Sequence, residues 1–252
     1  MQMGQHFMDK GEILGASPGE YRVGVLALAN DQVIERDLSL LLAPEILTFT
    51  TRIAFEGGCK LAELARMAPT LTEAARLLNP EVALDAVLFG CSSGTIAIGA
   101  DRIREAVQVV SPDAFVVNPI DAACAAFERL GARTLNLVTP YEPEIADLMA
   151  TTFTDRGFKI ANRYDFGIVE SADISRVRPE AIRTAALSLS TDSVEATFIS
   201  CTDFQSLHVL ASIEEQTGLP AVSSNQAMAW QIQDRSGVSS NSTDFGRLLS
   251  CL

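Results

Sequence analysis

The chain has 252 residues, of which 48% are hydrophobic and 20% charged, and its formal net charge is −13 at pH 7. This length is sufficient to bury a full hydrophobic core, and the acidic balance disfavours nucleic-acid binding because a phosphate backbone would be repelled. No apolar run reaches the roughly 18 residues that a membrane helix needs, so we expect no membrane partner.

The amino-terminal segment and the cysteine pattern indicate the cellular compartment. Residues 1–20 lack a basic segment followed by an apolar one, and we interpret them as a flexible leader and not as a signal peptide. The five cysteines are odd in number, widely spaced and without a CxxC pair, which fits neither a disulfide framework nor a zinc site. Two histidines are too few for a His-based metal site. We therefore predict a cytoplasmic protein without a bound metal.

Short apolar runs alternate with helix-like stretches from Tyr21 to Trp230. In chain order, we expect strands at 22–28, 47–53, 85–90, 114–117, 134–138, 158–166, 195–200 and 221–223. Helices are expected to fill the gaps between the strands, for example at 71–78, 95–109, 121–130, 142–156, 179–189, 207–217 and 225–233. Short buried strands that alternate with helices predict an α/β fold with parallel sheets and right-handed crossovers.

The chain also repeats itself once. The strand at 23–26 is matched by one at 135–138, and Cys91 at the end of the third expected strand is matched by Cys201, both at an offset of about 110 residues. Each half supplies four strands in matching order. We predict two pseudo-symmetric lobes, each a four-stranded parallel sheet, formed by residues 21–118 with 225–252 and by residues 119–224.

The two cysteines are the candidate catalytic residues. Ligands of open α/β sheets bind beyond the carboxyl ends of strands, so two facing lobes would bring Cys91 and Cys201 to one cleft from opposite sides. Ser92, Ser93 and Gly94 lead from Cys91 into a helix, and free amides there can bind an anion and lower a thiol pKa. We therefore expect Cys91 to form a thiolate near neutral pH. The alternative is a buried cysteine before an ordinary turn, which the matched positions disfavour.

Further polar residues follow the expected strands and could bind substrate in the same cleft. Asn30, Ser224 and Asn225 could instead cap helices, and Tyr141 could be a packing ring. Arg52 could neutralise an anion or form a surface ion pair. The candidate substrate-binding residues are Asn30, Ser92, Ser93, Tyr141, Thr202, Ser224 and Asn225.

Several of these segments resemble the maleate isomerase and arylmalonate decarboxylase family, within the aspartate/glutamate racemase superfamily. The resemblance extends from about Tyr21 to the carboxyl terminus, and within the family it points to proteins encoded with ectoine-utilisation enzymes. The segments are Val23-Gly24-Val25, Thr51-Arg52-Ile53, Cys91-Ser92-Ser93-Gly94-Thr95, Thr139-Pro140-Tyr141, Ser200-Cys201-Thr202 and Ser223-Ser224-Asn225-Gln226-Ala227.

The resemblance implies two lobes with a cleft between them, no metal, no organic cofactor and a homodimer. It also implies that Cys91 and Cys201 both act, and that Asn30 and Tyr141 match the asparagine and tyrosine of the family's cleft. A further cleft asparagine of the isomerases has no clear counterpart here; Ser171 falls near that place. This difference argues against maleate itself as the substrate.

The function that follows is cofactor-independent cis–trans isomerisation of a small dicarboxylate, with one cysteine as nucleophile and the other as acid or base. Racemisation of an amino acid or another 2-substituted acid by the same two cysteines is an alternative. An arylmalonate-type decarboxylase is another, but the decarboxylases keep only the second cysteine, so Cys91 counts against it. A non-catalytic protein that binds a small acid is the remaining alternative.

Overall fold

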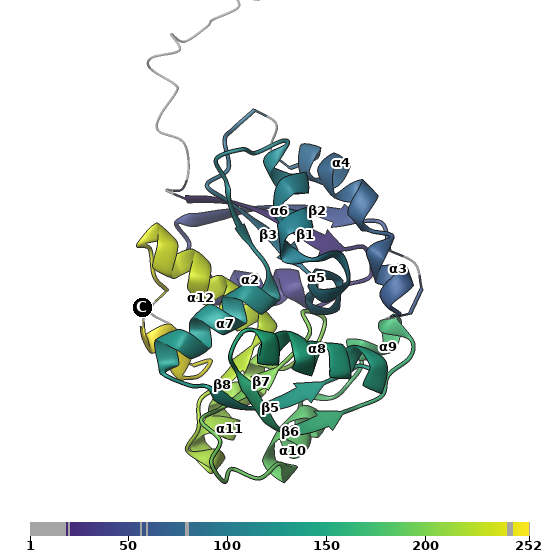
Figure 1. Cartoon of the computed structure of the whole chain (residues 1–252). Coiled ribbons are helices and arrows are strands. Elements are labelled where there is room, and N and C mark those ends of the chain that lie inside the picture. Colours follow the sequence, from purple (N-terminus) through teal and green to yellow (C-terminus); the bar gives the residue numbers. More distant parts are fainter. Residues whose placement is uncertain are drawn as a thin grey trace, which may run out of the picture.

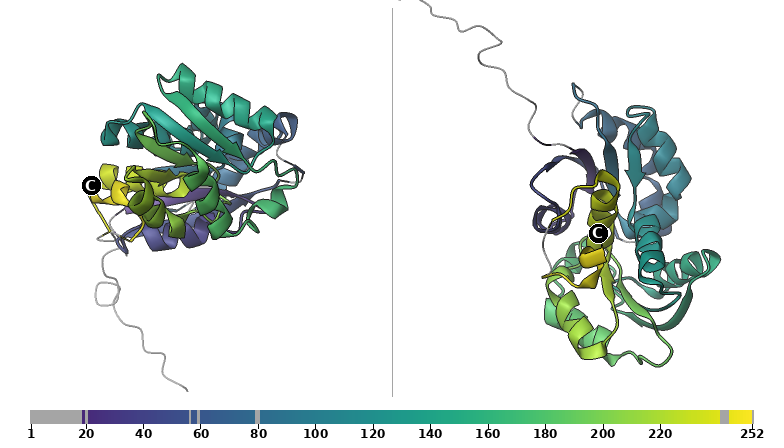
Figure 2. Two further views of the ribbon diagram at one scale, coloured as in Figure 1. Left: turned by 90° about the horizontal axis from the view of Figure 1, so that it is seen from below. Right: turned by 90° about the vertical axis from the view of Figure 1, so that its left-hand side faces the viewer.

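The computed structural model describes residues 19, 21–55, 57–58, 60–78, 81–240 and 244–251. It contains two four-stranded parallel sheets flanked by helices, which confirms the predicted two-lobed α/β fold (Figures 1 and 2). The predicted leader, residues 1–20, lies outside the described residues except for Gly19. Within the described ranges, no helix has the length and apolar character needed to span a bilayer.

The first sheet has the strand order β2-β1-β3-β4. Its strands are β1 (Tyr21–Leu28), β2 (Ile46–Ile53), β3 (Ala86–Gly90) and β4 (Phe115–Val117), and each neighbouring pair is parallel. Most of β1 and all of β3 are buried, as in strands covered on both faces. The edge strand β2 alternates between buried and more exposed residues, because only one of its faces packs on the core.

The second sheet repeats this arrangement, with the order β6-β5-β7-β8. Its strands are β5 (Thr134–Thr139), β6 (Lys159–Asp165), β7 (Ala196–Ile199) and β8 (Ala221–Ser223), again all parallel. The first strand of each half therefore pairs with the second and the third, which confirms the predicted internal repeat. Cys91 follows β3 and Cys201 follows β7, at equivalent places in the two sheets.

Helices connect the strands in both halves (Figure 1). Those of the first half are α2 (Ile34–Leu41), α3 (Leu61–Ala65), η1 (Ala68–Thr70), α4 (Leu71–Arg76), α5 (Ser92–Ile98), α6 (Ala100–Gln108) and α7 (Pro119–Leu130). Those of the second half are α8 (Pro143–Asp155), α9 (Ser171–Ile174), α10 (Pro179–Ser188), η2 (Leu207–Val209), α11 (Leu210–Thr217), α12 (Ser224–Ser236) and η3 (Arg247–Cys251).

The helix expected at 95–109 is in fact two helices, and this part of the prediction is wrong. Gly99 has φ +92°, a conformation that L side chains rarely adopt, so α5 ends there and α6 begins anew. Helices α2, α3 and α9 lie in gaps for which no helix range was named; α3 and α9 have too few residues for a helical periodicity to be recognised.

Helices α7 and α12 join the two halves. They pack against each other, and in Figure 1 they lie side by side between the levels of the two sheets. The Asn118 side chain caps α7 by accepting from the amides of Ile120 (3.1 Å) and Asp121 (2.9 Å). Helix α12 also packs on α2, and η3 packs on α7, so the carboxyl-terminal helices of the second half contact the first half at several places. The lobe boundaries at 118/119 and 224/225 stay a prediction.

An aromatic cluster fixes the strand that leads to Cys201. Phe198 of β7 packs edge to face against Phe127 of α7 and Phe153 of α8, with ring centroids 5.8 Å and 5.3 Å apart. All three rings are fully buried. The position of the Cys201 turn is thus set by a core that involves helices from both halves of the chain.

Candidate active site

A small cavity lies where the carboxyl ends of β1, β3, β5 and β7 converge. Cys91 and Cys201 both line it, so the fold brings the two predicted catalytic residues to one space. Of the predicted substrate-binding residues, four also line this cavity: Asn30, Ser93, Tyr141 and Thr202. They follow, respectively, β1, β3, β5 and β7, as expected for ligand-binding positions in open α/β sheets.

The cavity is small in this structure. Its volume is about 30 Å³, enough for one or two water molecules. We refer to this narrow arrangement as the closed form of the site.

The Cys91 side chain caps the start of α5. Its Sγ accepts from the Gly94 amide at 3.2 Å and lies 3.6 Å from Ser93 Oγ. A Cβ placed on Gly94 would be 2.9 Å from Cys91 Sγ and 2.9 Å from Met67 Cε. Only glycine at this position lets the helix amide approach the sulfur so closely.

The expectation that Cys91 is a thiolate near neutral pH is wrong for this closed form. Burial raises the pKa of the Cys91 thiol to about 11. Hydrogen bonds from Ser93 and the Gly94 amide lower the pKa, but by less, and the nearby Asp31 and Asp203 raise it further. Loss of water around the sulfur thus outweighs the donors at the helix start.

The Cys201 turn has an unusual backbone. Cys201 has φ +113°, one of two positive φ angles among the described non-glycine residues, and such a conformation costs on the order of 1–3 kcal/mol. The Cys201 amide donates to Ser224 Oγ at 3.1 Å, and Thr202 Oγ1 donates to the Gly90 carbonyl at 3.1 Å. These bonds from both halves of the chain hold a strained turn that presents the cysteine to the cavity.

Three residues predicted to bind substrate have a different setting. Ser92, Ser224 and Asn225 are buried but do not line the cavity. The hydroxyls of Ser92 and Ser224 are 2.9 Å apart, and Asn225 Nδ2 donates to the Thr202 carbonyl at 2.8 Å. Their side chains bond protein groups that hold the two cysteine turns against each other, and we propose that they position the thiols without touching substrate.

One wall of the cavity is formed by residues in and near α3 and α9, which lie next to each other in Figure 1. Asn30 Nδ2 donates to Ser171 Oγ at 2.9 Å, and this hydroxyl donates to the Gly57 carbonyl at 2.8 Å. Phe55, Leu64 and Ile174 supply the apolar part of the wall. These two hydrogen bonds and the apolar contacts between short segments cover the site on this side.

Sequence reasoning missed two acidic residues, Asp31 and Asp203, that line the cavity. Asp31 Oδ1 accepts from the amides of Val33 and Ile34, both at 2.8 Å, and Asp203 Oδ1 accepts from the Gln32 amide at 2.7 Å. Desolvation, followed by the charge of Asp31, raises the pKa of Asp203 to about 7. Their positions immediately after Asn30 and Thr202 were the available signal, but an acidic side chain was not expected in an anion site.

Arg52 forms an ion pair with Glu35, which is the second of the two roles that the sequence suggested for it. Its guanidinium also donates to the carbonyls of Leu28 (3.1 Å), Ala29 (3.2 Å) and Asp31 (2.8 Å). It therefore fixes the backbone behind the cavity and does not line it. The lining contains no arginine, lysine or histidine among the described residues.

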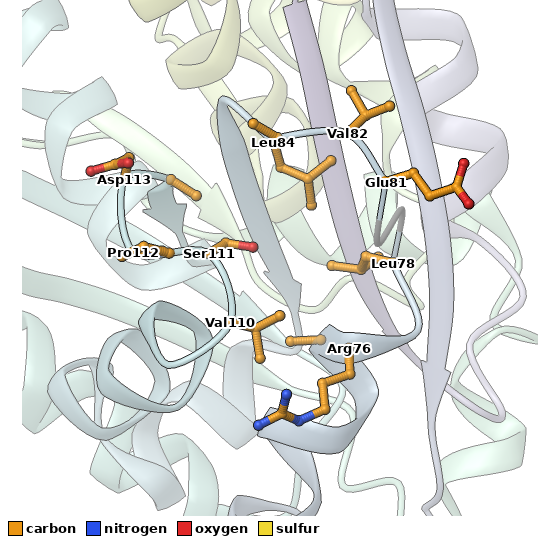
Figure 3. A pocket seen from close by; sticks show the side chains of 12 residues that line it. Arg76, Leu78, Glu81, Val82, Leu84, Val110, Ser111, Pro112 and Asp113 are labelled. Carbon is orange, nitrogen blue, oxygen red and sulfur yellow. The ribbon is translucent and has the colours of Figure 1, made fainter.

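A larger hollow of about 520 Å³ lies elsewhere (Figure 3). Its lining includes Arg76 at the end of α4, Leu84 before β3 and Asp113 before β4. These are the amino ends of the strands, at the far end of the sheet from Cys91. This hollow contains neither cysteine, so its size does not make it the candidate active site.

Comparisons with known proteins give related sequences and a related fold. The sequence model of the family described as arylmalonate decarboxylase matches residues 115–249. A maleate isomerase from Pseudomonas putida KT2440 is 23% identical over 80% of this chain and 86% of its own length. One from Nocardia farcinica is 24% identical over 85% and 89%. A solved structure of a cysteine-to-serine mutant of Nocardia farcinica maleate cis–trans isomerase, with a covalently bound succinylcysteine intermediate, has a TM-score of 0.83 at 22% identity, covering 91% of this chain and 98% of that one.

Proposed function

The chain belongs to the arylmalonate decarboxylase family, and we propose that it is a cofactor-independent cis–trans isomerase of a small unsaturated dicarboxylate. The observation that carries this proposal is the cavity that Cys91 and Cys201 share, one from the end of β3 and one from the equivalent end of β7. The relatives named as maleate isomerases support the reaction type. Among the described lining residues, the two thiols carry the side-chain group that is intrinsically the most nucleophilic.

The reaction begins when the acid enters the cavity. Cys91 Sγ adds to one alkene carbon as its thiol proton passes to solvent water, from which a proton returns when Cys91 leaves, and the alkene π electrons move towards the adjacent carboxylate to form an enediolate. Rotation about the resulting carbon–carbon single bond follows. Elimination of Cys91 restores the double bond in the trans configuration, and the enzyme regains its starting state without consuming a co-reactant.

Cys201 acts from the other side of the cavity as acid and base. Its S–H can protonate the enediolate carbon to give a succinyl thioether, and its thiolate can remove that proton before elimination. The covalent intermediate named in the structure of the Nocardia farcinica relative supports such an adduct. The strained turn that presents Cys201 supports a role in chemistry, because such strain persists only when the surroundings enforce it.

Asn30, Ser93, Tyr141 and Thr202 are the proposed substrate-binding residues. Each follows a strand whose end faces the cavity, and together they offer amide and hydroxyl donors to carboxylate and enediolate oxygens. The apolar residues Phe55, Leu64 and Ile174 would exclude water once the site has closed around the substrate.

The test is a proton NMR screen of small dicarboxylates and amino acids in deuterated water, beginning with maleate. We expect the wild type to convert a cis-dicarboxylate of the screen to its trans isomer, and Cys91→Ser and Cys201→Ser to do so at least 100-fold more slowly. Cys124→Ser is the matched control, since Cys124 lies on α7 and does not line the cavity. Wild-type rates in both active-site variants would refute the two-thiol mechanism.

Racemisation of an amino acid is a second candidate, and one observation favours it. Asp31 and Asp203 line the cavity, and a substrate ammonium could pair with them. In the same NMR screen, a racemase would exchange the α-hydrogen of its substrate for deuterium. A non-catalytic binding protein would give neither signal and would keep its ligand in Cys91→Ser. The homodimer that the family resemblance implies is tested by light scattering on the purified protein.

A further inference from the structure

Two carboxyl groups share the candidate site with the thiols. Asp31 and Asp203 line the cavity, and they are only 4% and 7% exposed. Each uses its Oδ1 to accept from backbone amides, of Val33 and Ile34 for Asp31 and of Gln32 for Asp203. The geometry of these loops therefore fixes both carboxyl groups in place.

The charged groups around this pair do not neutralise it. The one guanidinium that acts on both carboxyls is Arg52, which ion-pairs with Glu35 and donates to backbone carbonyls, so its charge is shared. The other titratable side chains that face the pair from the ends of β3, β5 and β7 are Cys91, Tyr141 and Cys201, none of which can be cationic. Two ionised carboxylates side by side in a buried space would repel each other strongly.

A shared proton resolves this repulsion. Asp31 and Asp203 line the same small cavity, and two carboxyl groups that face each other in such a space can form a hydrogen bond only if one of them is protonated. Desolvation raises the pKa of both, and that of Asp203 reaches about 7. Below this pH the pair holds one proton, and well above it the proton is lost.

We propose that Asp31 and Asp203 act as a proton-holding pair that donates an O–H hydrogen bond to a carboxylate of the substrate, so that binding a dicarboxylate takes up one proton from solvent. This inference rests on the proposed function, because it assumes an anionic ligand in the cavity. No bond except an O–H bond forms in this step, and the proton comes from buffer. The pair would thus make an acidic pocket able to accept an anion without a lysine or arginine.

Isothermal titration calorimetry with succinate tests this directly, because succinate is a dicarboxylate without a double bond to isomerise. Titrations in two buffers with different ionisation enthalpies give the number of protons taken up. We expect a value close to one at pH 8, where the pair of the free protein has lost its proton, and close to zero at pH 6. The dissociation constant should rise by up to about tenfold between pH 7 and pH 8.

Asp203→Asn is the informative variant, since the amide oxygen of asparagine can still accept from the Gln32 amide. It should bind succinate without proton uptake and with an affinity that does not change between pH 7 and pH 8. Asp101→Asn is the matched control, because Asp101 is exposed on α6 and ion-pairs with Arg104. It should keep the proton uptake of the wild type. A thermal melt of each variant shows that it is folded.

Three outcomes would overturn the inference. Succinate binding without proton uptake at pH 8 would show that the pair does not serve as the donor. Tighter binding of β-alanine, in which an ammonium replaces one carboxylate, with release of a proton, would assign the pair to a cationic group. Failure of every dicarboxylate to bind would refute both the proposed function and this inference. Turnover that needs both thiols, combined with succinate binding that does not depend on pH, would refute this inference alone.

Discussion

The reactivity of Cys91 towards iodoacetamide should report how strongly the closed site suppresses its thiolate. Burial raises the pKa of this thiol from the ordinary value of 9.0 to about 11. With this higher pKa, the fraction of Cys91 that is ionised at pH 8 is about 100-fold smaller. Only the thiolate is alkylated at an appreciable rate. The cavity of about 30 Å³ also leaves little room for the reagent, so 100-fold is the minimum suppression that we expect.

The assay is time-resolved alkylation at pH 8, followed by peptide mass spectrometry of the Cys91 peptide. The same residue in guanidinium-unfolded protein serves as the reference, which removes differences in intrinsic reactivity. We expect the native rate to be at least 100-fold lower and to rise by about tenfold per pH unit from pH 8 to pH 10. Native and unfolded rates within a factor of about three would refute the reasoning that desolvation dominates at this sulfur.

Three further changes test the site and its energetics. Gly94→Ala should lower the isomerisation rate at least tenfold in an NMR assay with little change in thermal stability, because the new Cβ would displace the Cys91 sulfur, which lies 2.9 Å from its ideal position; wild-type rates would contradict this. Cys201→Gly should be inactive yet more stable than Cys201→Ala by about 1 kcal/mol in urea unfolding, since glycine accepts φ +113° without strain; equal stabilities would show that the turn is unstrained. Asp203 has a folded-state pKa of about 7 against an ordinary value of 3.8, so the folded state binds the extra proton between these values and the free energy of unfolding should fall as the pH rises from about 4 to about 7. In the wild type this fall should amount to on the order of a few kcal/mol, and Asp203→Asn should remove most of it. If urea unfolding gives the same pH dependence for both proteins, Asp203 does not retain a proton.

The strands and the meeting of Cys91 and Cys201 at one cavity could be predicted from the sequence. Strands such as β3 are continuous buried apolar runs bounded by polar turns, and such runs are readable without a structure. Cys91 and Cys201 were recognised because the repeat places each at the end of an equivalent strand. The family resemblance then rested on those same turns.

The break between α5 and α6, the burial of Cys91 and the acidic residues of the cavity could not be predicted from the sequence. Gly99 looked like an interior residue of one long helix, although its positive φ divides α5 from α6. The pKa of Cys91 depends on burial by segments such as α9, which are distant in sequence. Asp31 and Asp203 approach each other only after the two halves have folded together, so neither looked unusual in its own segment.

The central claim is that Cys91 and Cys201 act on one substrate from two sides of a shared cavity. The most direct test is mass spectrometry of the Cys201→Ser variant after incubation with the cis-dicarboxylate that the wild type isomerises, with Cys91→Ser treated in parallel. We predict a mass gain equal to one molecule of that acid, located on the peptide that contains Cys91, and no such gain in Cys91→Ser. An unmodified Cys91 peptide, or an adduct on a cysteine outside the cavity, would contradict the account.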